Sequence, residues 1–179
     1  MTVERYLTEE NGYYRMDCSK AVWATDELHD VYHRCGLTDH LCDADFVLET
    51  GDRIILVEYK NATIPQAVEH AEHTKEYNPN EQKNFNKIVS KFFDSLHYLR
   101  LTGKDKPINY VFVVEFPKGN STSRRLLRNK FKTHLPFKLQ EEFSTGIKLI
   151  ESVDVVNIEE WNSNDIFGEF PLQRVPTTS

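Results

Sequence analysis

The spacing of hydrophobic and polar residues predicts a chain in which helices alternate with strands. The clearest helical pattern covers 81–101, where apolar residues recur every three or four positions on one stripe. Apolar runs at 108–116 and 147–157 predict buried strands. This alternation favours an α/β (mixed α+β) protein built on a mixed β-sheet with helices on both faces. Shorter helical patterns occur at 19–35, 65–76 and 121–134.

Residues 43–60 predict two strands joined by a tight turn. Gly51-Asp52 is expected to form a two-residue loop with Gly51 in the first central position of a type II′ turn. The loop fixes the register, because each residue before it then pairs with one after it. The opposed pairs are Asp45 with Glu58 and Asp43 with Lys60.

Three charged residues of this hairpin are expected on one face. Opposed residues share a face, and so do residues two apart, which groups Asp45 with Glu58 and Lys60. Two carboxylates on an apolar hairpin repel each other, and a divalent cation between them relieves that repulsion. The pattern therefore indicates a metal site at the end of a buried strand.

A further acid is expected from the helix predicted at 19–35. Glu27 lies at the edge of its apolar stripe, whereas Asp26 points away. Glu27 is therefore a candidate for the site, and the alternative is an acid at the flanking surface. The sequence leaves open whether Glu27 or Asp43 joins the site.

The length of 179 residues predicts a single domain, with a core at 19–157, a loosely packed arm or short strand at 1–17 and a partly mobile tail at 158–179. No signal peptide or membrane-spanning run is visible. Three cysteines without motif spacing are expected to be reduced, which favours a cytoplasmic protein.

Basic residues gather between 118 and 138, although the net charge is −6. No Asp or Glu occurs from Pro117 to Leu139, so this stretch is a candidate surface for phosphate groups, with a solvated helix face as the alternative. If this stretch binds a polyanion, the acidic C-terminal third is expected to lie away from that polyanion. Lys83, Lys87 and Lys91 form an exposed ladder that could extend this phosphate surface, with an ordinary solvated face as the favoured alternative. The candidate phosphate contacts are Lys118, Arg124, Arg125, Arg128 and Lys132.

Asp45, followed after twelve residues by Glu58-Tyr59-Lys60, resembles the signature of the PD-(D/E)xK (restriction-endonuclease-like) nuclease superfamily. The resemblance covers about 19–116 and includes the order of helices and strands, but Ala44 stands where the signature has proline. It implies that Asp45 and Glu58 hold Mg²⁺ or Mn²⁺ and that Lys60 assists the attacking water, with Glu27 as an additional acid.

The function expected from this resemblance is metal-dependent hydrolysis of phosphodiester bonds, in DNA rather than RNA. A homodimer is also expected, since cutting both strands commonly uses two active sites. The alternative is a catalytically inactive protein of the same fold that binds nucleic acid or protein. A zinc site is not favoured, because His29, His33, Cys35 and Cys42 lack the spacing of known zinc motifs.

Overall fold

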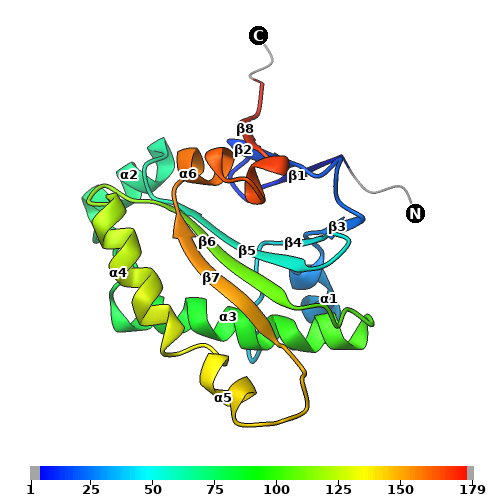
Figure 1. The fold of residues 1–179 in the computed structure, drawn as a ribbon. Coiled ribbons are helices and arrows are strands. Elements are labelled where there is room, and N and C mark those ends of the chain that lie inside the picture. The colour runs from blue at the N-terminus through cyan, green and yellow to red at the C-terminus, as the bar shows by residue number, and fades with distance from the viewer. Residues whose placement is uncertain (1–4, 177–179) are drawn as a thin grey trace.

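The protein contains a five-stranded mixed sheet and a smaller three-stranded antiparallel sheet (Figure 1). The structure, a computed structural model, describes residues 5–176. The strand order of the large sheet is β3 (Trp23–Thr25), β4 (Phe46–Glu49), β5 (Ile54–Asn61), β6 (Ile108–Glu115) and β7 (Ile150–Val156). The strand order of the small sheet is β1 (Tyr6–Thr8), β2 (Tyr14–Asp17) and β8 (Leu172–Arg174).

Strand direction changes in the middle of the large sheet. β3, β4 and β5 pair antiparallel, whereas β6 is parallel to β5 and β7 is parallel to β6. Parallel neighbours need a crossover, and here helices provide it. The helices are α1 (Leu28–Arg34), α2 (Pro65–His73), α3 (Gln82–Leu101), α4 (Ser121–Lys132), α5 (Phe137–Glu141) and α6 (Ile158–Ser163), with a short 3₁₀ helix, η1 (Phe167–Glu169).

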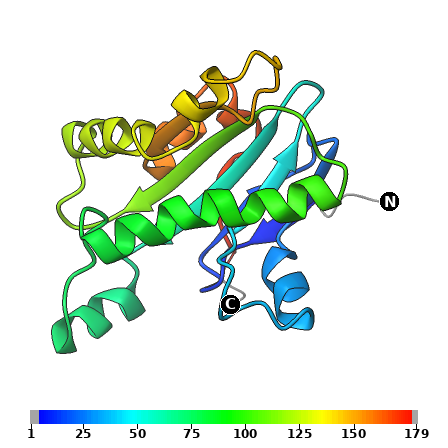
Figure 2. The ribbon, with the colours of Figure 1, turned by 90° about the horizontal axis from the view of Figure 1, so that it is seen from below.

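One face of the large sheet is covered by α3 and α4 (Figure 2). Ile54 and Leu56 of β5 point to this face, where they join one core cluster with Phe92 of α3 and Phe131 of α4. Because side chains alternate along a strand, Glu58 and Lys60 continue this row. The chemistry predicted for β5 therefore lies on the α3 side of the sheet.

The opposite face is covered by segments from both ends of the chain. Ile55 and Val57 of β5 pack in a second core cluster with Met16 of β2 and Leu172 of β8. Trp161 of α6 is fully buried in this cluster and donates a hydrogen bond from Nε1 to the backbone oxygen of Phe170 at 2.8 Å. Of the two alternatives predicted for 1–17, the short strand is confirmed by β1 and β2, and the loose arm is wrong for residues 6–17. The prediction of a partly mobile tail is wrong for 158–174, because these segments complete the core.

The helix predicted at 19–35 is wrong in its first half. Residues 23–25 form β3, which pairs with β4 by placing Trp23 opposite Glu49 and Thr25 opposite Val47. Trp and Thr favour strands, and β4 would otherwise present an unpaired edge. The helical spacing of apolar residues in this segment was therefore outweighed by pairing with a strand that lies far along the sequence.

The register predicted for the hairpin is confirmed for residues 46–49, whereas the predicted pairs of Asp45 with Glu58 and of Asp43 with Lys60 lie outside the paired strands, because Asp45 N donates to the oxygen of Val57. Phe46 pairs with Val57 and Glu49 with Ile54, and Thr50 N donates to the oxygen of Arg53 at 2.9 Å. The turn type is wrong, because Gly51 does not adopt the positive φ that a type II′ turn requires. Instead, the hydroxyl of Thr50 donates to the Asp52 carboxylate and accepts from Arg53 N, so the side chain closes the turn.

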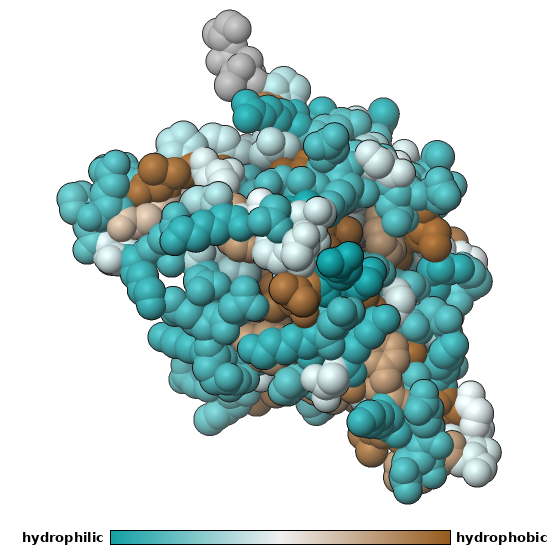
Figure 3. All heavy atoms as spheres, turned by 60° about the vertical axis from the view of Figure 1, so that its left-hand side comes forward, coloured by the Kyte–Doolittle hydropathy of each residue, from teal (hydrophilic) through white to brown (hydrophobic). Residues whose placement is uncertain are grey.

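The surface shown in Figure 3 is mainly hydrophilic, with apolar residues in small separate groups. Exposed apolar residues scattered in this way are common in folded proteins. No helix in the described part of the chain has the length and apolar character needed to cross a membrane. Cys18, Cys35 and Cys42 are free thiols, as expected.

Candidate active site

Asp45 is held at the start of β4 by contacts with β5 and α3. Its backbone N–H donates to the oxygen of Val57 at 3.0 Å, and its Oδ2 accepts from Tyr59 N at 2.7 Å. The segment just before it is fixed on α3, where Ala44 N donates to the buried hydroxyl of Ser95 at 3.1 Å. Asp45 is therefore held in place from two sides.

The two predicted carboxylates converge on a lysine of α3. Lys91 Nζ lies 2.6 and 2.8 Å from the two carboxylate oxygens of Glu58 and 3.7 Å from Oδ1 of Asp45. The side chain of Lys91 is 13% exposed and that of Glu58 is 9% exposed. A cation does lie between the two acids, and it is an ammonium group supplied by the chain. The expectation that Lys91 is exposed is wrong.

Burial and charge shift the ionisation of all three groups. Burial raises the pKa of Glu58 above its ordinary value, the charge of Asp45 raises it further, and Lys91 opposes both effects. Burial also raises the pKa of Asp45, against the effects of Lys91 and of the hydrogen bond from Tyr59. Burial alone would lower the pKa of Lys91, but the charges of Glu58 and Asp45 raise it overall. The two acids therefore depend on a nearby positive charge.

Lys91→Met is expected to make stability fall more steeply with pH in the presence of EDTA. The pKa values of Glu58 and Asp45 are higher in the folded protein than in the unfolded chain, so folding favours the protonated forms of both acids. The stability that this preference contributes is present at low pH and is lost as pH rises through the folded pKa values. Without Lys91 we expect an additional loss of about 2 kcal/mol or more at pH 8 relative to pH 5. Urea unfolding at both pH values measures it.

Lys83→Met is the matched control for this experiment, because Lys83 is exposed on the same helix two turns away. This variant removes one positive charge from the surface, and its free energy of unfolding should depend on pH as that of the wild type does. If the free energy of unfolding changed with pH equally in Lys91→Met and the wild type, Lys91 would not be the group that stabilises the charged forms of Asp45 and Glu58.

The site opens into a cleft of about 310 Å³ beside α3. Lys60 lies at its mouth, exposed, with Nζ 5.5 Å from the ring centroid of Tyr77. The turn between β1 and β2 supplies Glu10, whose charge contributes to the raised pKa of Asp45. Glu58 and Asp45 therefore face an accessible space that also contains Lys60.

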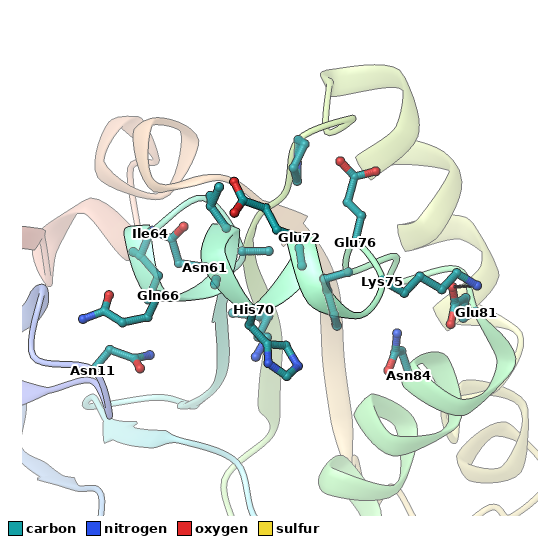
Figure 4. A pocket seen from close by; sticks show the side chains of 17 residues that line it. Asn11, Asn61, Ile64, Gln66, His70, Glu72, Lys75, Glu76, Glu81 and Asn84 are labelled. Carbon is teal, nitrogen blue, oxygen red and sulfur yellow. Dashed lines mark ion pairs between the residues drawn. The ribbon is translucent and has the colours of Figure 1, made fainter.

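Two further hollows continue this cleft along α3. A pocket of about 700 Å³ extends under α2 and shares Lys60, Tyr77 and Asn84 with the cleft. Figure 4 shows Gln66 and Asn11 on one side of it and Asn84 on the other. On the α1 side, a cleft of about 460 Å³ shares Glu10, Asp45 and Lys91. Together these three spaces form a groove along α3, called the α3 groove below.

Of the two open candidates for a further acid, Asp43 lies closer to the site. Asp43 lines the α1-side cleft, and its Oδ1 is 3.2 Å from Nδ1 of His29. Glu27 is exposed before α1 and lines none of the three parts of the α3 groove, although its charge acts on Tyr98. Asp26 lines the α1-side cleft instead, because the strand β3 replaces the predicted helix at this point.

The basic helix α4 is neutralised in part by the acidic C-terminal third. Arg124 is 7% exposed and donates from Nε and Nη2 to the Glu160 carboxylate at 2.8 and 2.6 Å. Arg128 lies 3.9 Å from Asp154 of β7. Burial leaves Arg124 no surface for a phosphate, and acids of the C-terminal third lie directly beside two residues of the basic stretch.

Arg124→Met is expected to destabilise the fold by about 1 to 3 kcal/mol, because it leaves Glu160 without its partner while the carboxylate keeps some access to water. Arg125→Met is the control, since Arg125 is exposed on the next position of the same helix and should change stability by less than about 0.5 kcal/mol. Urea unfolding measures both. Equal effects would show that Arg124 does not anchor α4.

The remaining basic candidates lie mostly away from the α3 groove. Arg125 and Lys132 are exposed on α4, which packs against β7 at one edge of the sheet, whereas α1 and α2 lie on the other side of α3 (Figure 2). Lys118 is closer to the groove: its Nζ is 3.3 Å from Glu76, which lines the pocket under α2. A ligand in the α3 groove can therefore reach Lys118 more readily than α4.

Sequence reasoning missed two contributors to the site. Lys91 is three residues after Ile88 and four before Ser95, both buried, so helical spacing did place it beside the core stripe. No comparable pattern identified Glu10, because only the packing of the small sheet brings the β1–β2 turn to the cleft.

Comparison with known proteins identifies no relative of this chain. No protein-family model matches the sequence, no curated protein matches it, and no solved structure matches the fold.

Proposed function

We propose that this protein is a metal-dependent nuclease that hydrolyses phosphodiester bonds, with DNA as the expected substrate. The observation that carries the proposal is the convergence of Asp45 and Glu58 on one cationic point inside an open cleft, with Lys60 at the mouth. Support also comes from the strand order: an antiparallel trio followed by a parallel strand after a crossover helix agrees with the resemblance stated for residues 19–116.

The donor set suits Mg²⁺ or Mn²⁺. Within residues 5–176, no three or more His, Cys, Asp or Glu side chains are grouped so that they could hold a metal. Two carboxylates alone do not close the shell of a structural zinc site. Mg²⁺, in contrast, usually takes one or two carboxylates and fills its other positions with water and substrate phosphate. Asp45 and Glu58 would hold the ion, at the position between them where the structure has the Lys91 ammonium.

Each residue of the chain has a separate task in this proposal. A bound Mg²⁺ or Mn²⁺ would neutralise the phosphate and promote formation of hydroxide. Tyr59 N fixes Oδ2 of Asp45, so Oδ1 is the oxygen directed at the cation. Lys60, exposed at the cleft mouth, orients the attacking water or stabilises the charge that develops on the phosphate. The α3 groove receives the chain of nucleotides on either side of the scissile bond.

Incubation of the purified protein with supercoiled DNA, linear duplex, single-stranded DNA and RNA tests the proposal. Cleavage is expected in Mg²⁺ or Mn²⁺ and should stop in EDTA. If none of the four substrates is cut with either metal, the proposal is wrong.

A second candidate function is a catalytically inactive protein of this fold that binds nucleic acid or protein. The position of Lys91 favours it, since the ammonium already pairs with Glu58 and faces Asp45, in the place that a metal would take. Substrate binding without cleavage, unchanged by Mn²⁺ and by EDTA, would support this candidate over the first.

A further inference from the structure

We propose that Lys91 is an internal competitor for the metal, so that a divalent cation binds to Asp45 and Glu58 only when the Lys91 ammonium leaves the space between them. The inference rests on the proposed function in taking Asp45 and Glu58 as the cation ligands. It adds a regulatory property of the site, which concerns cation affinity and not the reaction itself.

Contact distances show why the two cations exclude each other. Both oxygens of Glu58 accept from Lys91 Nζ, and Oδ1 of Asp45 faces the same nitrogen. A divalent cation takes its oxygen ligands at about 2.0–2.6 Å, in the same place as the ammonium. Since two positive charges at that separation repel strongly, Lys91 and the metal cannot share the carboxylates.

The structure also provides a place for the displaced side chain. Lys91 borders both the central cleft and the α1-side cleft of about 460 Å³. The second cleft contains Asp43 and Glu10, and the charge of Asp43 already acts on Lys91. Rotation of the lysine toward these acids would keep its charge compensated while it frees the two ligand carboxylates.

This arrangement gives the pair of acids a default partner. Without a divalent cation, Lys91 prevents the buried Glu58 and the partly buried Asp45 from lying without a positive charge, which would be costly. With a divalent cation, binding must first break the contact between Lys91 and Glu58, which lowers the apparent affinity. The protein is therefore expected to need a higher concentration of metal than two carboxylates in an open cleft would require.

Titration of the metal alone, by calorimetry with Mn²⁺, tests the inference without any nucleic acid. Lys91→Met keeps the length of the side chain and removes its charge, and it should bind Mn²⁺ more tightly than the wild type by about tenfold or more. Lys83→Met should match the wild type, because it removes the same charge from an exposed position of α3. Equal or weaker binding by Lys91→Met would overturn the inference.

Lysine acetylation followed by mass spectrometry tests the same point in the wild-type protein, in which no variant has to fold. Lys91 should be modified slowly in EDTA, because its side chain is 13% exposed, and several-fold faster with saturating Mn²⁺. Lys83 should react at the same rate in both conditions. Continued protection of Lys91 with Mn²⁺ bound would overturn the inference.

The outcomes separate this inference from the proposed function. Tighter Mn²⁺ binding by Lys91→Met together with no cleavage of any nucleic acid would support the competition and contradict the nuclease. Metal-dependent cleavage with unchanged Mn²⁺ affinity in Lys91→Met would support the nuclease and overturn the competition. Absence of Mn²⁺ binding in both proteins would overturn the competition as well.

Discussion

Asp45→Asn is expected to lower metal-dependent cleavage by at least about a hundredfold, which corresponds to a few kcal/mol of transition-state stabilisation lost with the cation. The amide oxygen can still accept the hydrogen bond from Tyr59 N, so the hairpin should fold as in the wild type. The amide lacks the negative charge that attracts the cation opposite Glu58. We therefore expect the cleavage rate and the affinity for the metal to fall, and the free energy of unfolding to stay close to that of the wild type.

Initial cleavage rates over a range of Mn²⁺ concentrations measure the effect, with urea unfolding to verify the fold. The control is Asp52→Asn, the same chemical change at the exposed turn of the same hairpin, far along the strands from the cleft. It should cut at the wild-type rate. Wild-type activity in Asp45→Asn would remove this carboxylate from the proposed mechanism.

Trp161→Ala is expected to cost about 3 to 5 kcal/mol of folding free energy, the range for large aromatic truncations in a core. The indole is fully buried, stacks on Phe167 with ring centroids 5.1 Å apart, and donates to the oxygen of Phe170. Its removal leaves a cavity under α6 and a backbone carbonyl without its partner. Because this layer also contains β2 and β8, we expect the small sheet to loosen with it.

Urea or thermal unfolding measures this cost. Trp161→Phe is the graded control: it keeps an aromatic ring against Phe167 but loses the hydrogen bond to Phe170, so a smaller loss of about 1 to 2 kcal/mol is expected. A loss below 1 kcal/mol for Trp161→Ala would show that residues 158–174 pack weakly, as the prediction of a mobile tail assumed.

Much of the large sheet could be predicted from local patterns. The helix predicted at 81–101 is α3 (Gln82–Leu101), and the strand predicted at 108–116 is β6 (Ile108–Glu115). These elements are long and strongly periodic, so packing reinforces what the sequence already favours. The terminal layer could not be predicted in this way, because its short strands are stable only when β2 pairs with β1 and β8, whose residues lie far apart in the sequence.

The part of the candidate site that lies on the β4–β5 hairpin could be predicted from the sequence. A single tight turn sets the register of both strands, which pairs Phe46 with Val57 and so brings Asp45 and Glu58, the residues next to this pair, to the same end of the hairpin. The type of turn did not matter for this result: Gly51 adopts a different conformation from the expected one, yet the loop still has two residues. Strand alternation then placed Lys60 on the same face as Glu58.

The partner of these acids was decided only by the tertiary structure. Helical spacing showed that Lys91 lies beside the buried stripe of α3, but a helix period does not show what the stripe faces. Lys91 meets Glu58 across 33 residues of sequence because α3 packs over β5 and is pinned to the segment before Asp45. The sequence thus determined that two carboxylates share one face of the sheet, and packing determined that a lysine of α3 lies between them.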